Sequence, residues 1–241
     1  MSKRLKIAFI SSIIVVLFIA LGSIAYFNGL SGLHNNGKVD DGKIKVACVG
    51  DSITYGHGVA MWPKNHYPAQ LQQILGDKYC VFNFGVSGST AQSDGDKPYV
   101  ETKSYTESIA FDADIVVIML GTNDAKPQNW KDLSTFLSKY KALIDSYKQN
   151  NNDVKIYVCS PATAFFQKDG QKDGPAAFDI QPNIVKGIAE SISEFCSKNG
   201  YLYIDMYNNV ADKQLFLNDG IHPNKAGAAV IAQIVASSIT K

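Results

Sequence analysis

Short apolar runs alternate with longer amphipathic stretches from Ile44 to the C-terminus. The apolar runs predict strands over residues 45–50, 79–84, 113–120, 154–159 and 201–206. The stretches with helical spacing predict helices over residues 68–75, 130–149, 184–197 and 225–239. Continuous apolar strands separated by helices are typical of a parallel sheet that is covered on both faces. The pattern therefore predicts an α/β fold, a three-layer αβα sandwich with a central parallel sheet of about five strands in the flavodoxin-like order 2-1-3-4-5.

The N-terminal part of the chain has a different pattern. Three cationic residues, Lys3, Arg4 and Lys6, precede an uncharged apolar run over residues 7–27. Such a run can cross a hydrocarbon core of ~30 Å as a helix, and its cationic flank stays on the cytoplasmic side. We therefore expect residues 1–27 to be a signal anchor, 28–43 a flexible linker rich in Gly, Asn and Asp, and 44–241 an extracytoplasmic domain.

A cleaved signal peptide is the alternative for this segment. Ser23-Ile24-Ala25 offers a small-x-small cleavage site, and cleavage near Ala25 would release the domain as a secreted protein. The apolar run is longer than in most signal peptides, which favours the anchor.

Composition narrows the class of protein. The chain has 241 residues, 46% of them hydrophobic and 19% charged, which suits one domain with a short extension. Its net charge of +1 and the lack of a basic stripe argue against a nucleic-acid partner. Arg4 is its only arginine, so a guanidinium clamp for phosphate cannot form in the domain. The 4 cysteines form no C-x-x-C pair, which argues against a zinc site and predicts buried free thiols.

Small and polar residues follow three of the predicted strands. They read GDSIT at 50–54, NFGVSG at 83–88 and GTND at 121–124, and a fourth block, DGIHP at 219–223, precedes the last helix. In an open parallel sheet, sites form beyond the carboxyl ends of the strands. We therefore expect all four blocks to meet at one edge of the sheet.

Each block has a plain structural explanation and a chemical one. Ser52 is either a helix cap or a nucleophile, and Asp219 and His222 form either a local turn or a base with its orienting carboxylate. Gly85 and Asn123 are either turn residues or donors to an oxyanion. Together, the residue types are those that acyl transfer through a serine requires.

The four blocks, in this order, resemble those of the SGNH (GDSL) hydrolase superfamily. The resemblance implies that Ser52 is the nucleophile, His222 its base and Asp219 the partner of His222. It also implies an oxyanion hole made by the N–H groups of Ser52 and Gly85 and the side chain of Asn123, with no metal or cofactor required. Asp51 is usually structural in this superfamily.

Further segments are similar to the sialate O-acetylesterase-like or carbohydrate acetylesterase subset, for example YPAQLQQILGDKY, DIVVIMLGTNDAKPQNW and SPATAF. This similarity implies deacetylation of a small-molecule or polysaccharide ester. Aromatic residues near the predicted edge could contact a sugar, or simply pack within the fold; the candidates are Tyr55, Trp130 and Phe165.

Three other functions stay open at this point. A lysophospholipase- or thioesterase-type lipid esterase would need a long apolar groove, whereas residues 167–179 are polar. A non-catalytic glycan-binding module would not need the serine, histidine and aspartate. A phosphoryl-transfer or metal enzyme using Asp51, Asp124 and Asp219 is disfavoured because the chain has no P-loop.

Overall fold

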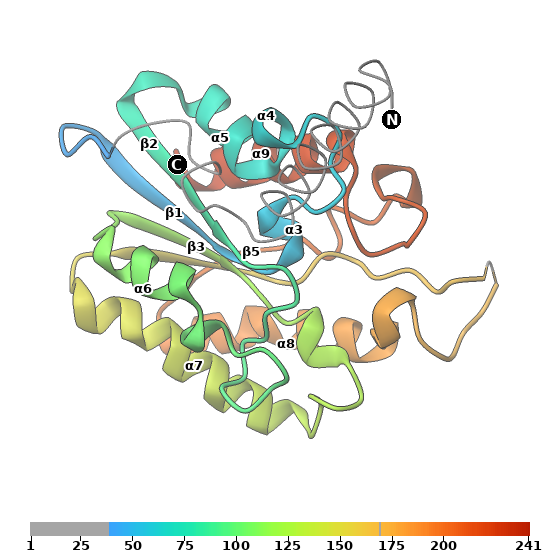
Figure 1. Ribbon diagram of the computed structural model, residues 1–241. Coiled ribbons are helices and arrows are strands. Elements are labelled where there is room, and N and C mark those ends of the chain that lie inside the picture. The colour runs from blue at the N-terminus through green and yellow to red at the C-terminus, as the bar shows by residue number, and fades with distance from the viewer. Residues whose placement is uncertain (1–38, 169) are drawn as a thin grey trace, which may run out of the picture. The chain divides into compact units, whose positions relative to one another are not determined.

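Parallel strands form the centre of the domain in the computed structural model, which describes residues 39–168 and 170–241. The sheet has five strands in the order β2-β1-β3-β4-β5, and every neighbouring pair is parallel (Figure 1). The strands are β1 (Ile44–Gly50), β2 (Tyr79–Gly85), β3 (Ile115–Met119), β4 (Lys155–Cys159) and β5 (Leu202–Ile204). The predicted fold class and strand order are therefore confirmed.

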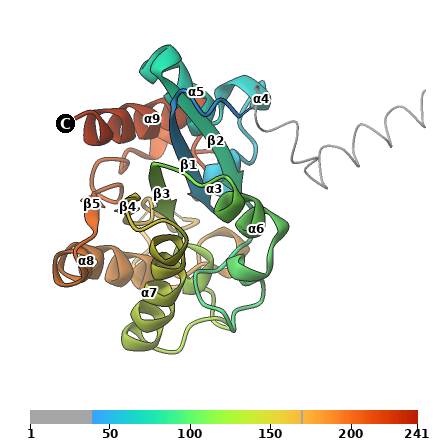
Figure 2. The same ribbon diagram turned by 90° about the vertical axis from the view of Figure 1, so that its left-hand side faces the viewer.

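Helices cover both faces of this sheet, as the views in Figures 1 and 2 show. One face carries α5 (Tyr67–Leu75) and α9 (Lys225–Ile239). The other carries α6 (Lys103–Ala110), α7 (Leu133–Asn150) and α8 (Pro182–Asn199). Two short helices, α3 (Ser52–Tyr55) and α4 (Trp62–Asn65), lie between β1 and α5 in the chain. The described residues, 39–168 and 170–241, belong to one compact unit.

Alternation along the strands explains why two layers of helices are needed. Val46 and Cys48 of β1 pack toward α5 and α9, whereas Ala47 and Val49 pack toward the other three helices. All four side chains are fully buried. A strand that is apolar on both faces must be covered on both, and this is what the continuous apolar runs predict.

The four cysteines are unpaired and buried, as predicted. Burial raises the pKa of the Cys48 thiol to about 12, which keeps it protonated and unreactive.

The predicted signal anchor lies outside the described residues. Among residues 39–168 and 170–241, no helix is long and apolar enough to span a membrane.

Candidate active site

The carboxyl ends of the three adjacent strands β2, β1 and β3 lie level with one another. Gly50 pairs with Gly85 on one side and with Met119 on the other. The segments that follow these strands therefore begin at one edge of the sheet, as the sequence blocks predict.

Ser52 is the first residue of α3 and is 8% exposed. The cap of this helix is Asp51, whose Oδ1 accepts a 2.9 Å hydrogen bond from the N–H of Ile53. The Ser52 side chain is therefore not used as a cap, and its hydroxyl points to another partner.

That partner is His222. Its Nε2 lies 2.8 Å from Oγ of Ser52, and its Nδ1 lies 2.7 Å from Oδ2 of Asp219. The other carboxylate oxygen of Asp219 accepts the N–H groups of Ile221 and His222, both at 2.9 Å. The following helix, α9, is capped by Asn224 and not by Asp219. The structure thus brings Ser52, His222 and Asp219 into one hydrogen-bonded chain.

The electrostatics of Asp219 suit an orienting carboxylate. Burial acts to raise its pKa, but the hydrogen bonds from the ring and the N–H of His222 and from the N–H of Ile221 outweigh this effect. They lower the pKa of Asp219 to about 2. The group is therefore a carboxylate at any pH near neutrality.

Two aromatic rings flank the ring of His222. His57 lies with its centroid at 4.6 Å and its plane tilted by 46°. Phe178 meets His222 edge-to-face, with centroids 5.4 Å apart and planes at 73°. Partial burial and the proximity of His222 lower the pKa of His57, although Asp219 acts to raise it. His57 is therefore neutral near pH 7, and neither neighbour adds charge beside His222.

The N–H of Gly85, which the sequence predicts as an oxyanion donor, is already engaged in a hydrogen bond. It donates a 2.9 Å hydrogen bond to Oδ1 of Asn83, so this donor is engaged within its own strand. A Cβ at this position would lie 2.2 Å from the backbone nitrogen of Tyr55 in α3. The glycine is therefore required because β2 and α3 pack backbone against backbone, which fixes the position of Ser52.

Gly88 has a backbone N–H that is not engaged in this way. Within the described residues, its N–H and that of Ser52 have no hydrogen-bond acceptor. Gly88 has φ +83, a conformation that favours glycine, and it is partly exposed, whereas Gly85 is buried. The sequence contains both glycines in the same NFGVSG block, and these structural differences, which the sequence does not show, distinguish the two.

The side chain of Asn123 lies at the end of β3 and is 5% exposed. Its Nδ2 donates long hydrogen bonds to the carbonyl oxygen of Ser89, at 3.2 Å, and to Oδ2 of Asp51, at 3.4 Å. The main-chain carbonyl oxygen of Asn123 accepts a hydrogen bond from Nδ2 of Asn129 at 2.9 Å. The amide is therefore oriented by its surroundings and only weakly bonded.

Asp51 and Asp124 are buried structural groups. Asp124 accepts the N–H groups of Ala91 and Gln92, both at 2.9 Å, and so fixes the loop after β2. Burial raises the pKa of both carboxyls to about 6, against the hydrogen bonds that lower it. Among the residues that the structure describes, no cluster of His, Cys, Asp or Glu could hold a metal ion.

The three candidate sugar-contact residues each have an aromatic neighbour within the fold. Tyr55 stacks on Trp62 with centroids 5.1 Å apart, and Trp130 packs against Phe136 of the core. Phe165 packs edge-to-face on Phe216, and its N–H donates to the carbonyl oxygen of Gly220, beside Asp219. Phe165 is thus hydrogen-bonded to the loop that carries His222.

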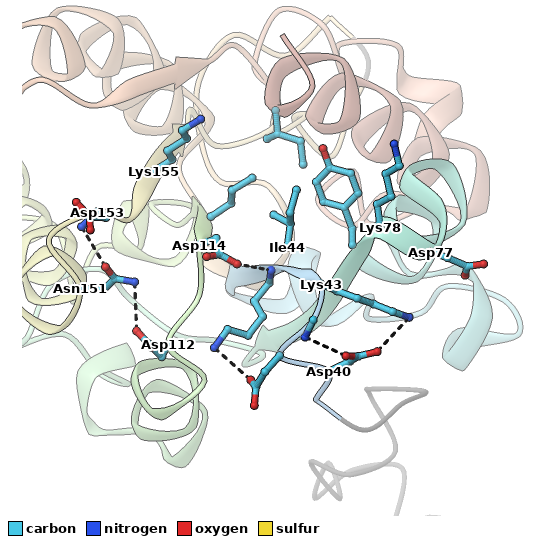
Figure 3. Close-up of a pocket in the computed structure, with 16 residues that line it drawn as sticks. Asp40, Lys43, Ile44, Asp77, Lys78, Asp112, Asp114, Asn151, Asp153 and Lys155 are labelled. Atoms are coloured by element: carbon cyan, nitrogen blue, oxygen red, sulfur yellow. Dashed lines mark hydrogen bonds and ion pairs between the residues drawn. The ribbon is translucent and has the colours of Figure 1, made fainter.

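An open cavity of about 1100 Å³ lies at the opposite edge of the sheet, where the strands begin (Figure 3). It is lined by residues such as Ile44, Tyr79 and Lys155, the first residues of β1, β2 and β4. Ser52 and His222 do not line it, so it is separate from the arrangement described above.

Comparison with known proteins identifies the family of the chain. The model of the GDSL-like lipase/acylhydrolase family matches residues 48–230, which include all four sequence blocks. The chain belongs to this family. The predicted SGNH (GDSL) relationship of the chain is thereby confirmed.

One curated relative extends the comparison. The chain is 36% identical over 217 residues to an acetylxylan esterase of Xylanibacter ruminicola, and the alignment covers 81% of the chain and 43% of that protein. The chain therefore spans less than half the length of that relative.

Two solved structures share the fold of this chain. A carbohydrate acetylesterase family member from Sinorhizobium meliloti has a TM-score of 0.68 at 18% identity, over 81% of this chain and 96% of that one. The inhibitor-bound aryl esterase of M. smegmatis has a TM-score of 0.67 at 19% identity, over 81% and 98%.

Proposed function

We propose that this chain is a serine esterase that removes O-acetyl groups from carbohydrates. The observation that carries the proposal is the hydrogen-bonded chain from Ser52 through His222 to Asp219. With Nδ1 of His222 protonated and donating to Asp219, Nε2 is an acceptor for the hydroxyl proton of Ser52. This arrangement makes Ser52 a nucleophile and His222 a general base.

The reaction follows two steps. Oγ of Ser52 attacks the ester carbonyl carbon while His222 takes its proton, and the C–O bond to the sugar breaks as His222 gives that proton to the sugar oxygen. A water molecule then attacks the acyl carbon and gives a proton to His222. Acetate leaves as Oγ of Ser52 recovers that proton.

The oxyanion of both steps is held by the N–H groups of Ser52 and Gly88 and by Nδ2 of Asn123. Gly88 replaces Gly85 in this assignment because the Gly85 N–H is engaged with Asn83. The long hydrogen bonds of Asn123 are readily exchanged for a shorter one to a charged oxygen.

The choice of acetyl and of carbohydrate rests on the similarity to acetylxylan esterase, the highest sequence identity among these comparisons. The shared fold of a carbohydrate acetylesterase is compatible with it. The substrate is thus an acetylated sugar or polysaccharide, such as acetylated xylan.

The test combines labelling with acetate release by the full chain. A fluorophosphonate probe is expected to label the wild type and not Ser52→Ala, while the exposed Ser237→Ala serves as the control. Acetate release from acetylated xylan is expected to exceed hydrolysis of octanoyl esters. A preference for octanoyl esters would instead indicate a lipid esterase, and glycan binding without labelling would indicate a binding module.

We also propose that residues 7–27 anchor the domain on the outer side of the membrane. The proposal rests on the cationic flank and the apolar run in the sequence. Fractionation of cells is expected to recover the full-length chain with the membranes. A soluble form in the medium that starts near Tyr26 would contradict the anchor.

A further inference from the structure

The turn that contains Phe178 places an exposed ring beside His222. The side chain of Phe178 is 56% exposed, although its ring lies in contact with a histidine that is only 5% exposed. It is the one phenylalanine among the large hydrophobic side chains that the described residues expose. An exposed aromatic ring at this place is accessible to a bound substrate.

The backbone of this turn is strained. Phe178 and Asp179 have φ of +60 and +59, and the N–H of Ile180 donates to the carbonyl oxygen of Ala177 at 3.3 Å. Two successive residues with positive φ form the pattern of a type I′ turn, which favours Asn and Gly. A phenylalanine there costs conformational energy, and such strain is concentrated at functional sites.

The two sides of the turn are fixed to the fold. Ala176 and Ile180 are 1% and 2% exposed and pack in a small cluster with Ile221, the residue before His222. The N–H of Gln181 donates to the carbonyl oxygen of Ala125, in the 3-10 helix that contains Asn123. The turn is thus fixed to the two segments that carry His222 and Asn123, and it presents Phe178 at its tip.

Proton transfer from His222 to the leaving alcohol determines which part of the substrate lies beside the ring of Phe178. His222 returns a proton to the oxygen of the leaving alcohol, so the sugar must lie beside the imidazole. His57 occupies one neighbouring position of the ring, and Phe178 another. Of these two, Phe178 has most of its surface exposed.

We propose that Phe178 is a specificity-determining residue that stacks against the sugar ring of the leaving group; this inference rests on the proposed function. The face of a phenyl ring carries partial negative charge, and the axial C–H groups of a pyranose carry partial positive charge. The acyl group, on the other side of the ester bond, does not take part in this contact.

The test compares two substrates of the full chain. One is an acetylated xylo-oligosaccharide, and the other is ethyl acetate, whose alcohol has no ring to stack. Phe178→Ala is expected to raise KM for the oligosaccharide about fivefold and to lower the ratio of kcat/KM for oligosaccharide over ethyl acetate by a similar factor. Phe178→Trp is expected to restore the ratio.

Ile74→Ala is the matched control, because Ile74 is a 45% exposed apolar side chain on α5, outside the turn and the loop that carry Phe178 and His222. Its ratio is expected to equal that of the wild type. An equal fall of kcat on both substrates in Phe178→Ala would show that the ring only supports His222, and would overturn the inference. A wild type that hydrolyses ethyl acetate but not the oligosaccharide would instead overturn the proposed carbohydrate substrate.

Discussion

Oγ of Ser52 and Nε2 of His222 lie 2.8 Å apart although 170 positions separate the two residues in the chain. Ser52 follows the first strand of the sheet, and His222 precedes the last helix. The topology of the parallel sheet brings them together, because both segments lie at the carboxyl edge of the strands.

Replacing the carboxylate beside His222 tests the role of this contact. Asp219→Asn keeps an acceptor for the N–H groups of the loop, but its amide favours the wrong tautomer of His222. We expect kcat to fall by about 10³–10⁴, with the fold intact. Steady-state kinetics with acetylated substrate measure this effect. Asp212→Asn, at an exposed cap, is the control and is expected to keep wild-type kcat; an equal loss in both variants would count against the assignment.

The amide of Asn123 is expected to act on the transition state. Asn123→Ala removes one oxyanion donor, so we expect kcat to fall by about 10²–10³. KM is expected to change much less, because the ground-state ester needs this donor less than the oxyanion does. Asn208→Ala, at an exposed asparagine, provides the comparison. A rise in KM at constant kcat would show instead that Asn123 binds substrate.

Gly85 is expected to matter for stability and position, not as a donor. In Gly85→Ala the new Cβ would lie 2.2 Å from the backbone nitrogen of Tyr55, so α3 or β2 must move. We expect a loss of roughly 2–3 kcal/mol in the free energy of unfolding. Denaturant unfolding measures it.

A second glycine offers the matched control. Gly187 lies inside α8, and a Cβ there would meet nothing within 4 Å. Gly187→Ala is therefore expected to gain about 1 kcal/mol from helix propensity. A Gly85→Ala variant as stable as the wild type would contradict the close packing of β2 on α3.

Buried carboxyls predict how stability depends on pH. The pKa of Asp124 is raised from its ordinary value of 3.8 to about 6, so the native state binds a proton more tightly than the unfolded chain. Its stabilising effect is complete below about pH 4 and is lost as the pH rises through 6. Asp51 acts in the same direction. Asp219, whose pKa is lowered to about 2, has the opposite effect: its stabilising contribution is lost as the pH falls below about 4.

The measurement is the free energy of unfolding between pH 4 and pH 7. We expect it to fall with rising pH by roughly 2–3 kcal/mol for each of the two raised carboxyls at most. Asp124→Asn is expected to be less stable at every pH but to show a shallower slope. An unchanged slope would mean that Asp124 is ionised throughout.

The sequence pattern was sufficient for the main elements of the fold. All five strands and the four long helices lie within a few residues of their predicted positions, because both carry strong apolar patterns. The helix α6 was missed because it is short and mostly polar, although Thr102 is a recognisable cap. The helix α3 was missed because four residues carry no period.

The site could be predicted only in part, for a physical reason. Ser52 and Asn123 are predictable from residue type and from their place after strand ends, and Asp219 and His222 from their spacing in the loop before the last helix. Which glycine has a free N–H depends on the side chain of Asn83, and no periodicity reports that contact. Phe178 lies in a polar segment, and its approach to His222 depends on a turn that its own residue type disfavours.

The loop that carries Asp219 and His222 is closed by its own backbone. The N–H of Leu217 donates to the carbonyl oxygen of His222 at 2.8 Å, and that of Gly220 to the carbonyl oxygen of Leu217 at 3.0 Å. The acid–base pair is thus assembled locally, and only the nucleophile arrives from a distant part of the chain. A variant that displaces α3, such as Gly85→Ala, should therefore leave the hydrogen bond between His222 and Asp219 in place.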